Sequence, residues 1–150
     1  MYLDSLILTR KPPEVQIAER RVVLGEVFDG VHLVEEFPTK LEFGVYMELG
    51  FEPQEHGEHE VRVVGELVAE ALKEERTLFH RDDVYIWEPD SDWWLPRLRA
   101  FPFEAQWELE DEADFQLLVY GRPPDGDSEF LGDKPILIRR CVVPDGPGDL

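Results

Sequence analysis

The sequence predicts a mainly β protein, an antiparallel two-sheet sandwich of about eight strands, and three observations support this expectation. Apolar residues fall in strand-length groups, and in the clearest groups they alternate with polar residues, as in a half-buried strand. Turn-forming residues separate these groups about every ten to fifteen positions. Helix-forming segments are too few to cover both faces of a parallel sheet, so antiparallel pairing is expected.

The first third of the chain contains four candidate strands. Tyr2 to Leu8 is apolar enough for the first one. Asp29-Gly30 stands between the β-branched runs 22–28 and 31–34, and this dipeptide favours a hairpin, because both central positions of its tight turn accept positive φ. From Leu41 to Leu49 the alternation of apolar and polar residues is the clearest in the sequence, which predicts a half-buried strand.

The rest of the chain contains further candidate strands and one ambiguous segment. The candidate strands cover 60–64, 84–87, 103–110, 115–120 and 135–143. Between Glu66 and Arg76, strong helix formers support a short helix as well as a continuing strand, and this choice stays open. Residues 1–143 are expected to form a single domain. Residues 144–150 lack a periodic apolar signal and are expected to form a flexible tail.

The chain is strongly acidic. Its 150 residues include 34 acidic and 15 basic side chains, which give a net charge of -19. The acids are spread over the whole chain and occupy many polar positions of the alternating strands, so acidic outer sheet faces are expected. Because binding to nucleic acid and to anionic membranes depends on clustered Lys and Arg, neither is an expected partner. A basic protein or a cation is compatible with this charge.

Cysteine content and targeting signals bear on the compartment. Cys141 is the single cysteine, so an intrachain disulfide is excluded. The first residues include Asp4 and lack the basic start of a signal peptide, and no apolar run approaches the roughly 20 residues of a membrane helix. A cytoplasmic protein is therefore expected. The absence of asparagine and the preference for arginine over lysine are typical of a GC-rich bacterial source.

The segment from Trp87 to Arg99 is the first candidate binding site. It has the prolines and aspartates of a loop, yet it contains three of the four tryptophans. If the rings are exposed, they suit a protein interface or stacking on a sugar, whereas a loop folded over the open end of the sandwich would use them to fill the core. The candidate binding residues are Trp87, Asp90, Asp92, Trp93, Trp94, Arg97 and Arg99.

A weaker candidate is a metal site at His56 and His59. These histidines lie in a loop rich in glutamate, and imidazole and carboxylate are ligands of zinc and other divalent ions. Their His-x-x-His spacing has no accompanying helix or second ligand pair. A hydrophilic connection between two strands explains the same residues.

Catalytic motifs are sparse. No serine, threonine or cysteine stands in a strained glycine elbow or beside a histidine in the sequence, and no glycine-rich phosphate loop is present. A calcium-loop pattern begins at Asp125 but fails at Phe130, where the sharp turn of such a loop needs glycine. The sequence therefore favours a protein without catalytic activity and without a cofactor.

Three stretches follow the order of strand, acidic-glycine turn, strand and closing hairpin. They are Glu36-Phe37-Pro38 with the strand over 41–49, Glu55 to Val63, and the late pair Ala113 to Gly121 and Lys134 to Ile138. In this order the chain resembles a family of small bacterial β-sandwich proteins of uncharacterised function. The segment 66–99 departs from the family because it is longer and more aromatic. The resemblance implies a fold, and it implies no catalytic residues.

These observations lead to one expected function and several alternatives. We expect a non-catalytic, acidic interaction module that binds a protein partner or self-associates. The first alternative is a module that binds a carbohydrate or a divalent cation. A metal-dependent enzyme and a mimic of nucleic acid are the remaining alternatives.

Overall fold

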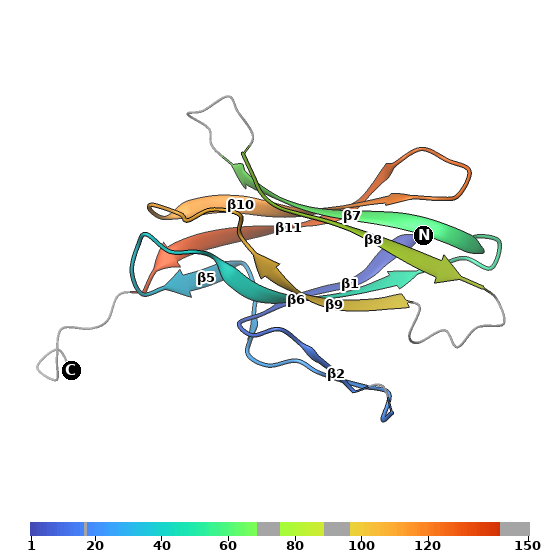
Figure 1. Ribbon diagram of the computed structural model, residues 1–150, viewed down its shortest axis with the longest axis horizontal. Coiled ribbons are helices and arrows are strands. Elements are labelled where there is room, and N and C mark those ends of the chain that lie inside the picture. Colours follow the sequence, from blue (N-terminus) through green and yellow to red (C-terminus); the bar gives the residue numbers. More distant parts are fainter. Residues whose placement is uncertain (17, 69–75, 89–96, 142–150) are drawn as a thin grey trace, which may run out of the picture.

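The computed structural model describes residues 1–16, 18–68, 76–88 and 97–141. These residues form eleven strands and no α-helix, so the predicted mainly β fold is confirmed (Figure 1). The strands are β1 (Tyr2–Thr9), β2 (Glu14–Gln16), β3 (Arg21–Val23), β4 (Val27–Phe28), β5 (Val31–Val34), β6 (Glu42–Gly50), β7 (Gly57–Val68), β8 (Arg76–Trp87), β9 (Leu98–Glu104), β10 (Ala113–Arg122) and β11 (Glu129–Arg140). The described residues thus contain more strands than the expected eight, and they form three sheets.

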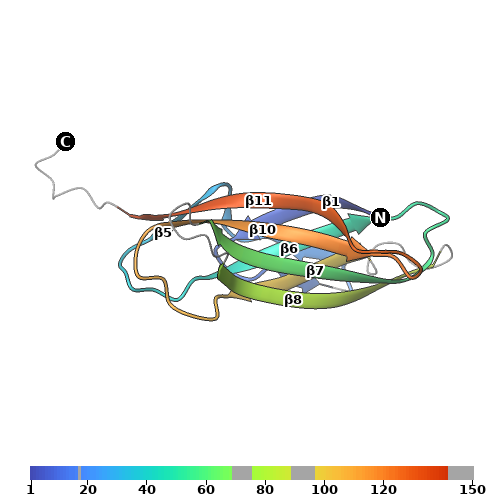
Figure 2. The ribbon, with the colours of Figure 1, turned by 90° about the horizontal axis from the view of Figure 1, so that it is seen from above.

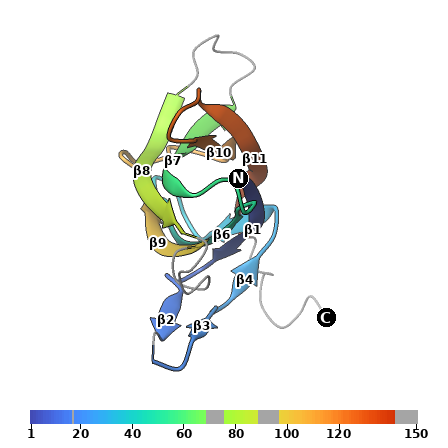
Figure 3. The same ribbon diagram turned by 90° about the vertical axis from the view of Figure 1, so that its right-hand side faces the viewer.

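Two larger sheets enclose the core. One has the order β4-β1-β6-β9, and the other has the order β5-β11-β10-β7-β8. All neighbours are antiparallel except β5 and β11, which pair in parallel. Viewed end-on, the five-stranded sheet curves over the four-stranded one (Figure 3). Seen from above, strands β11, β10, β7 and β8 run side by side over β1, β6 and β9 (Figure 2).

Aromatic side chains fill the centre of the core. Phe103 stacks on Phe43, with ring centroids 4.2 Å apart, and on Phe79, with centroids 4.4 Å apart. These rings come from β9, β6 and β8, so they join the two sheets. Each fully buried large apolar side chain stabilises the fold by about 1.5–3 kcal/mol. The other fully buried large side chains include Leu8, Leu41, Met47, Leu49, Leu78, Tyr85, Phe115, Leu117, Ile136 and Ile138.

The predicted hairpin at Asp29-Gly30 is wrong. β4 before it pairs with β1, and β5 after it pairs in parallel with β11, so the turn carries the chain from one sheet to the other. Gly30 has φ +77°, a region in which glycine is favoured, and its carbonyl accepts a hydrogen bond of 2.7 Å from the N–H of Leu137. Asp29-Gly30 does form a turn, but the pairing of β4 with β1 and of β5 with β11 makes this turn a connection between the two sheets.

The predicted strand over 103–110 is correct only at its start. β9 ends at Glu104, after which the N–H of Ala105 donates to Leu41 and the N–H of Gln106 donates to Leu78 of the opposite sheet. Leu109 forms an isolated bridge with Thr39. Ala105 and Leu109 are nevertheless buried, so the alternation of burial continues where the strand ladder has stopped.

The ends of the ambiguous segment 66–76 are strand. Residues 66–68 finish β7, residue 76 begins β8, and 69–75 lie outside the described residues. The expected tail over 144–150 also lies outside them. Among the residues that the structure does describe, no helix is long and apolar enough to cross a membrane.

Candidate functional site

The predicted aromatic loop is only partly described. Trp87, Arg97 and Arg99 have defined positions, whereas Asp90, Asp92, Trp93 and Trp94 lie outside the described residues. Trp87 is half-buried, and its ring stacks on Phe51 with centroids 5.6 Å apart and an angle of 9° between the planes. Phe51 in turn contacts the ring of His59 at 4.9 Å. Trp87 therefore packs at one end of the core.

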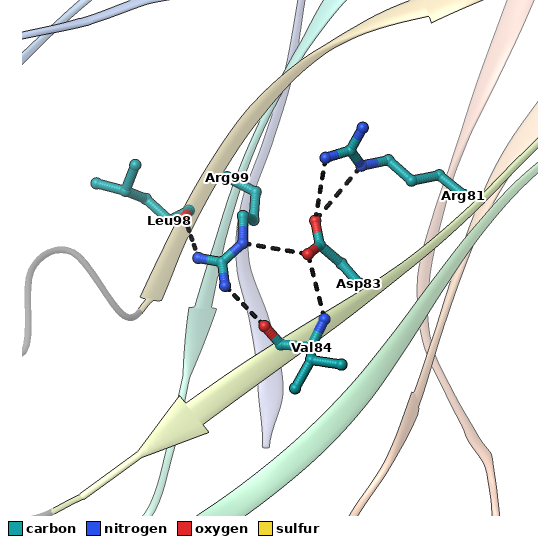
Figure 4. Close-up of polar contacts among 5 residues, drawn as sticks. All are labelled: Arg81, Asp83, Val84, Leu98 and Arg99. Atoms are coloured by element: carbon teal, nitrogen blue, oxygen red, sulfur yellow. Dashed lines mark hydrogen bonds and ion pairs between the residues drawn. The ribbon is translucent and has the colours of Figure 1, made fainter.

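Arg99 joins the two sheets along the side where β8 faces β9. Its Nη2 donates to the carbonyl of Val84 at 2.7 Å, and its Nη1 donates to the carbonyl of Leu98 at 2.8 Å (Figure 4). Its Nε lies 3.5 Å from Asp83 Oδ1, and the guanidinium stands 4.2 Å from the ring centroid of Tyr85. The contacts with Asp83, Val84 and Tyr85 thus hold β8 to β9.

Two further arginines strengthen the same side of the molecule. Arg81 donates to Asp83 Oδ2 at 3.3 Å and stands 4.4 Å from the ring centroid of Phe101 (Figure 4). Arg97 donates through Nε to the carbonyl of Leu49 at 2.7 Å. The predicted binding residues Arg97 and Arg99 therefore have structural contacts. Arg99 links β9 to β8, which share no backbone ladder, whereas Arg97 bonds to β6, the ladder partner of β9.

The predicted metal pair does not converge. His59 is fully buried on the inner face of β7, where its Nε2 lies 2.5 Å from the carbonyl oxygen of Glu55, whereas His56 is exposed. Over the described part of the chain, no group of three or more His, Cys, Asp and Glu side chains is placed to hold a metal ion. The two histidines differ because His56 precedes β7, in the connection from β6, whereas His59 occupies an inward-facing position of β7.

An open groove of about 620 Å³ lies on the outer face of the five-stranded sheet. The β10–β11 connection rises over this face and borders the groove (Figure 1). A smaller concavity of about 260 Å³ adjoins it and shares Glu60 and Arg122. The residues that line the groove are Glu60, Val61, Arg62, Asp82, Asp83, Val84, Tyr120, Arg122 and Ser128.

The charged side chains of the groove are paired across neighbouring strands. Arg62 Nε donates to Asp82 Oδ1 at 3.0 Å, and Arg122 Nη2 lies 2.5 Å from Glu60 Oε2. The hydrogen bond from Arg62 holds the pKa of Asp82 below its usual range, and a contact from His80 at 3.2 Å acts in the same direction. The carboxylate therefore stays ionised at neutral pH.

Apolar side chains lie between and beside these pairs. Val84 is 42% exposed, and Ile86, which follows it on the same face of β8, is 57% exposed. Phe130 is 56% exposed and packs edge-on against Tyr120, with centroids 5.8 Å apart. One outward-facing surface thus combines exposed apolar area with charge, and it is formed by Glu58, Glu60 and Arg62 of β7, Asp82, Val84 and Ile86 of β8, Tyr120 and Arg122 of β10, and Phe130 of β11. We call this surface the outer groove.

The sequence gives little indication of the outer groove. The strand over 84–87 was predicted correctly, but its pattern does not say which face is turned to solvent. Val84 and Ile86 look like core residues in the sequence, whereas the structure turns Tyr85 inward and leaves them outside. An exposed apolar residue on each side of a buried tyrosine is the signal that sequence reasoning missed.

Comparisons with known proteins do not indicate a function for the chain. No model of a protein family matches the chain, and no curated protein matches it. The function is therefore argued from the outer groove itself.

Proposed function

We propose that the protein is a non-catalytic interaction module that binds the basic surface of a protein partner through the outer groove. The observation that carries the proposal is the exposure of Val84, Ile86 and Phe130 around the acid–base pairs of β7, β8 and β10. Exposed aromatic and aliphatic groups beside charged ones are typical of surfaces that bind other proteins.

The charge of the molecule favours a basic surface on the partner. Its net charge of -19 attracts a cationic surface and accelerates the encounter, while repelling phosphates. Within the groove, Arg62 and Arg122 are each neutralised by an acid, and Glu58 is a further exposed acid at the adjoining concavity. A partner with lysine or arginine around an apolar centre complements such a surface.

The framework suits binding more than catalysis. We infer that the two larger sheets act as the layers of a β-sandwich, which presents the groove on strands fixed by the core. The lowered pKa of Asp82 keeps this carboxylate charged, which suits an ion pair better than a role as general acid near neutral pH. The side chains lining the groove thus provide shape, charge and apolar contact.

The test is site-specific photo-crosslinking in the organism from which the chain comes. A photoreactive phenylalanine analogue, p-benzoyl-phenylalanine, replaces Val84 in the groove or, as the control, Val31 of β5. The two valines are matched: they are 42% and 41% exposed and lie near opposite edges of one sheet. We expect a protein crosslinked from position 84 and absent from position 31.

A basic surface on the partner should be repelled by a positive charge in the groove. The substitution Val84→Arg should therefore abolish co-purification of the same partner with the full chain, whereas Val31→Arg should leave it intact. Raised salt should weaken the complex. Crosslinks of equal strength from both positions, or none from position 84, would refute the proposal.

A further inference from the structure

The ribbon formed by β2 and β3 is set apart from the rest of the fold. It is a two-stranded sheet of its own, with Val15 opposite Val22 and Glu14 opposite Val23. It extends away from the body of the molecule, on the side of the four-stranded sheet (Figures 1 and 3). A lone two-stranded ribbon is marginally stable in water, so contact with another surface would stabilise it.

The chemistry of the ribbon complements the outer groove. The segment 10–23 carries four bases against two acids, in a chain whose net charge is -19. Arg20 and Arg21 lie at and next to the tip, and both are exposed. Val23 is 39% exposed, and Val15 and Val22 are partly exposed. Val15 and Val22 share one face of the ribbon, and Arg21 and Val23 share the other. The second face therefore offers a β-branched side chain beside an arginine, which is the chemistry that the groove requires.

The ribbon and the groove of one molecule lie on opposite sides of it. The groove opens on the outer face of the five-stranded sheet, whereas the ribbon projects from beneath the four-stranded sheet (Figures 1 and 3). A ribbon is thus unable to reach the groove of its own chain.

We propose that the ribbon of one molecule occupies the outer groove of a second copy, with the arginine tip beside Glu58 and Glu60 and with Val23 against Val84 and Ile86. This inference rests on the proposed function, because it names the second copy as the bearer of the basic surface. The two contacting surfaces differ, so each contact leaves one ribbon and one groove free. Head-to-tail contacts of this kind produce a series of oligomers, which ends only if a ring closes.

The experiment is sedimentation velocity on the full chain and three variants, at physiological ionic strength over a range of concentrations. The ribbon variant is Arg20→Glu with Arg21→Glu, the groove variant is Val84→Arg, and the matched control is Val31→Arg. We expect the wild type and the control to sediment faster as concentration rises, and each of the other two variants to remain monomeric. Thermal unfolding of every variant checks that it is folded.

The decisive sample is an equimolar mixture of the ribbon variant and the groove variant. The mixture contains one intact groove and one intact ribbon per pair, so it should form a 1:1 dimer and nothing larger. A wild type that stays monomeric at every concentration, a ribbon variant that still assembles, or a mixture without dimer would overturn the inference.

The crosslink from position 84 separates this inference from the proposed function. A crosslink to a peptide of residues 10–23 supports both. A crosslink to a different, basic protein, together with a monomeric wild type, overturns the ribbon contact and leaves the proposed function standing. Absence of any crosslink from position 84 overturns both.

Discussion

At the scale of single residues, the Tyr85 hydroxyl is a buried polar group without a hydrogen-bond partner in the part of the chain that the structure describes. Burial raises the pKa of Tyr85, so the phenol stays neutral. Removing an unpaired buried hydroxyl relieves its desolvation cost. Tyr85→Phe should therefore leave the free energy of unfolding unchanged or raise it by up to about 1 kcal/mol. Urea denaturation measures the change.

Tyr46 provides the matched comparison. Its hydroxyl donates to Glu48 Oε2 at 3.2 Å, and burial, with the charge of Glu48 next, raises the pKa of Tyr46 to about 12. Tyr46→Phe loses this hydrogen bond and should lower the free energy of unfolding by about 0.5–1.5 kcal/mol. If Tyr85→Phe cost as much as Tyr46→Phe, the Tyr85 hydroxyl would have a partner, such as an ordered water.

His32 makes stability depend on pH. It is buried, its ring lies 4.9 Å from that of Phe28, and its Nδ1 has no partner among the described residues. Burial lowers the pKa of His32, and the charge of Arg10 adds to the effect. The unfolded chain therefore binds a proton more readily than the folded one as pH falls below about 6.5. Stability is full above that pH and declines as pH falls toward the lower pKa of the folded state.

Replacing His32 should reduce the loss of stability as pH falls. Between pH 7 and pH 5, His32→Gln is expected to lose less stability than the wild type, as measured by urea denaturation at each pH. His56→Gln, at an exposed histidine, is the control and should keep the wild-type slope. Equal slopes for all three proteins would show that His32 does not titrate in this range.

At the scale of strands, side chains of the same chain bind the backbone of Val84 on the free edge of β8. The N–H of Val84 donates to Asp83 Oδ1 at 3.2 Å, and its carbonyl accepts from Arg99. The facing edge strand β9 contains Pro102, which has no N–H to donate. Edges protected in this way resist pairing with another chain. The polar contacts of Arg99 therefore stabilise the fold and also discourage aggregation.

Arg99→Met tests this role. The variant keeps apolar contact with Tyr85 but loses hydrogen bonds to Val84 and Leu98, so the free energy of unfolding should fall by about 1–3 kcal/mol. Arg62→Met, which breaks an ion pair whose side chains are both 59% exposed, is the control and should cost about 0–1 kcal/mol. Urea denaturation gives the energies, and light scattering reports edge pairing. Equal losses for the two variants would contradict a special role for Arg99.

The same strands show what the sequence could and could not reveal. The strand over 41–49 was predictable because one of its faces is buried along its whole length. The path of the chain after Asp29-Gly30 was not predictable, because the same turn is compatible with a hairpin and with a crossing between sheets. The pairing of β4 with β1 and of β5 with β11, which are distant in the sequence, determines which of the two forms. The outer groove escaped prediction for a related reason: the cross-strand pairs Arg62–Asp82 and Arg122–Glu60 exist only once the register is set.

At the scale of the whole molecule, the net charge of -19 opposes folding, because it brings like charges together. Close ion pairs such as Arg62–Asp82 and Arg139–Asp114 offset part of the repulsion. The 34 acids exceed the 15 bases, however, so most of the repulsion between acids is not offset in this way. Screening should therefore stabilise this protein. The Debye length falls from about 30 Å at 10 mM salt to about 8 Å at 150 mM, which removes repulsion between distant acids while close pairs persist.

We expect the Tm to rise as NaCl increases over this range, and each kcal/mol gained corresponds to roughly 2–4 °C for a chain of this size. Differential scanning calorimetry in NaCl, KCl and tetramethylammonium chloride at matched ionic strength separates screening from ion binding. Screening depends on ionic strength alone, so the three salts should give the same rise. A constant or falling Tm would mean that attractive pairs outweigh the diffuse repulsion. A rise confined to one cation would instead indicate a specific site for that ion.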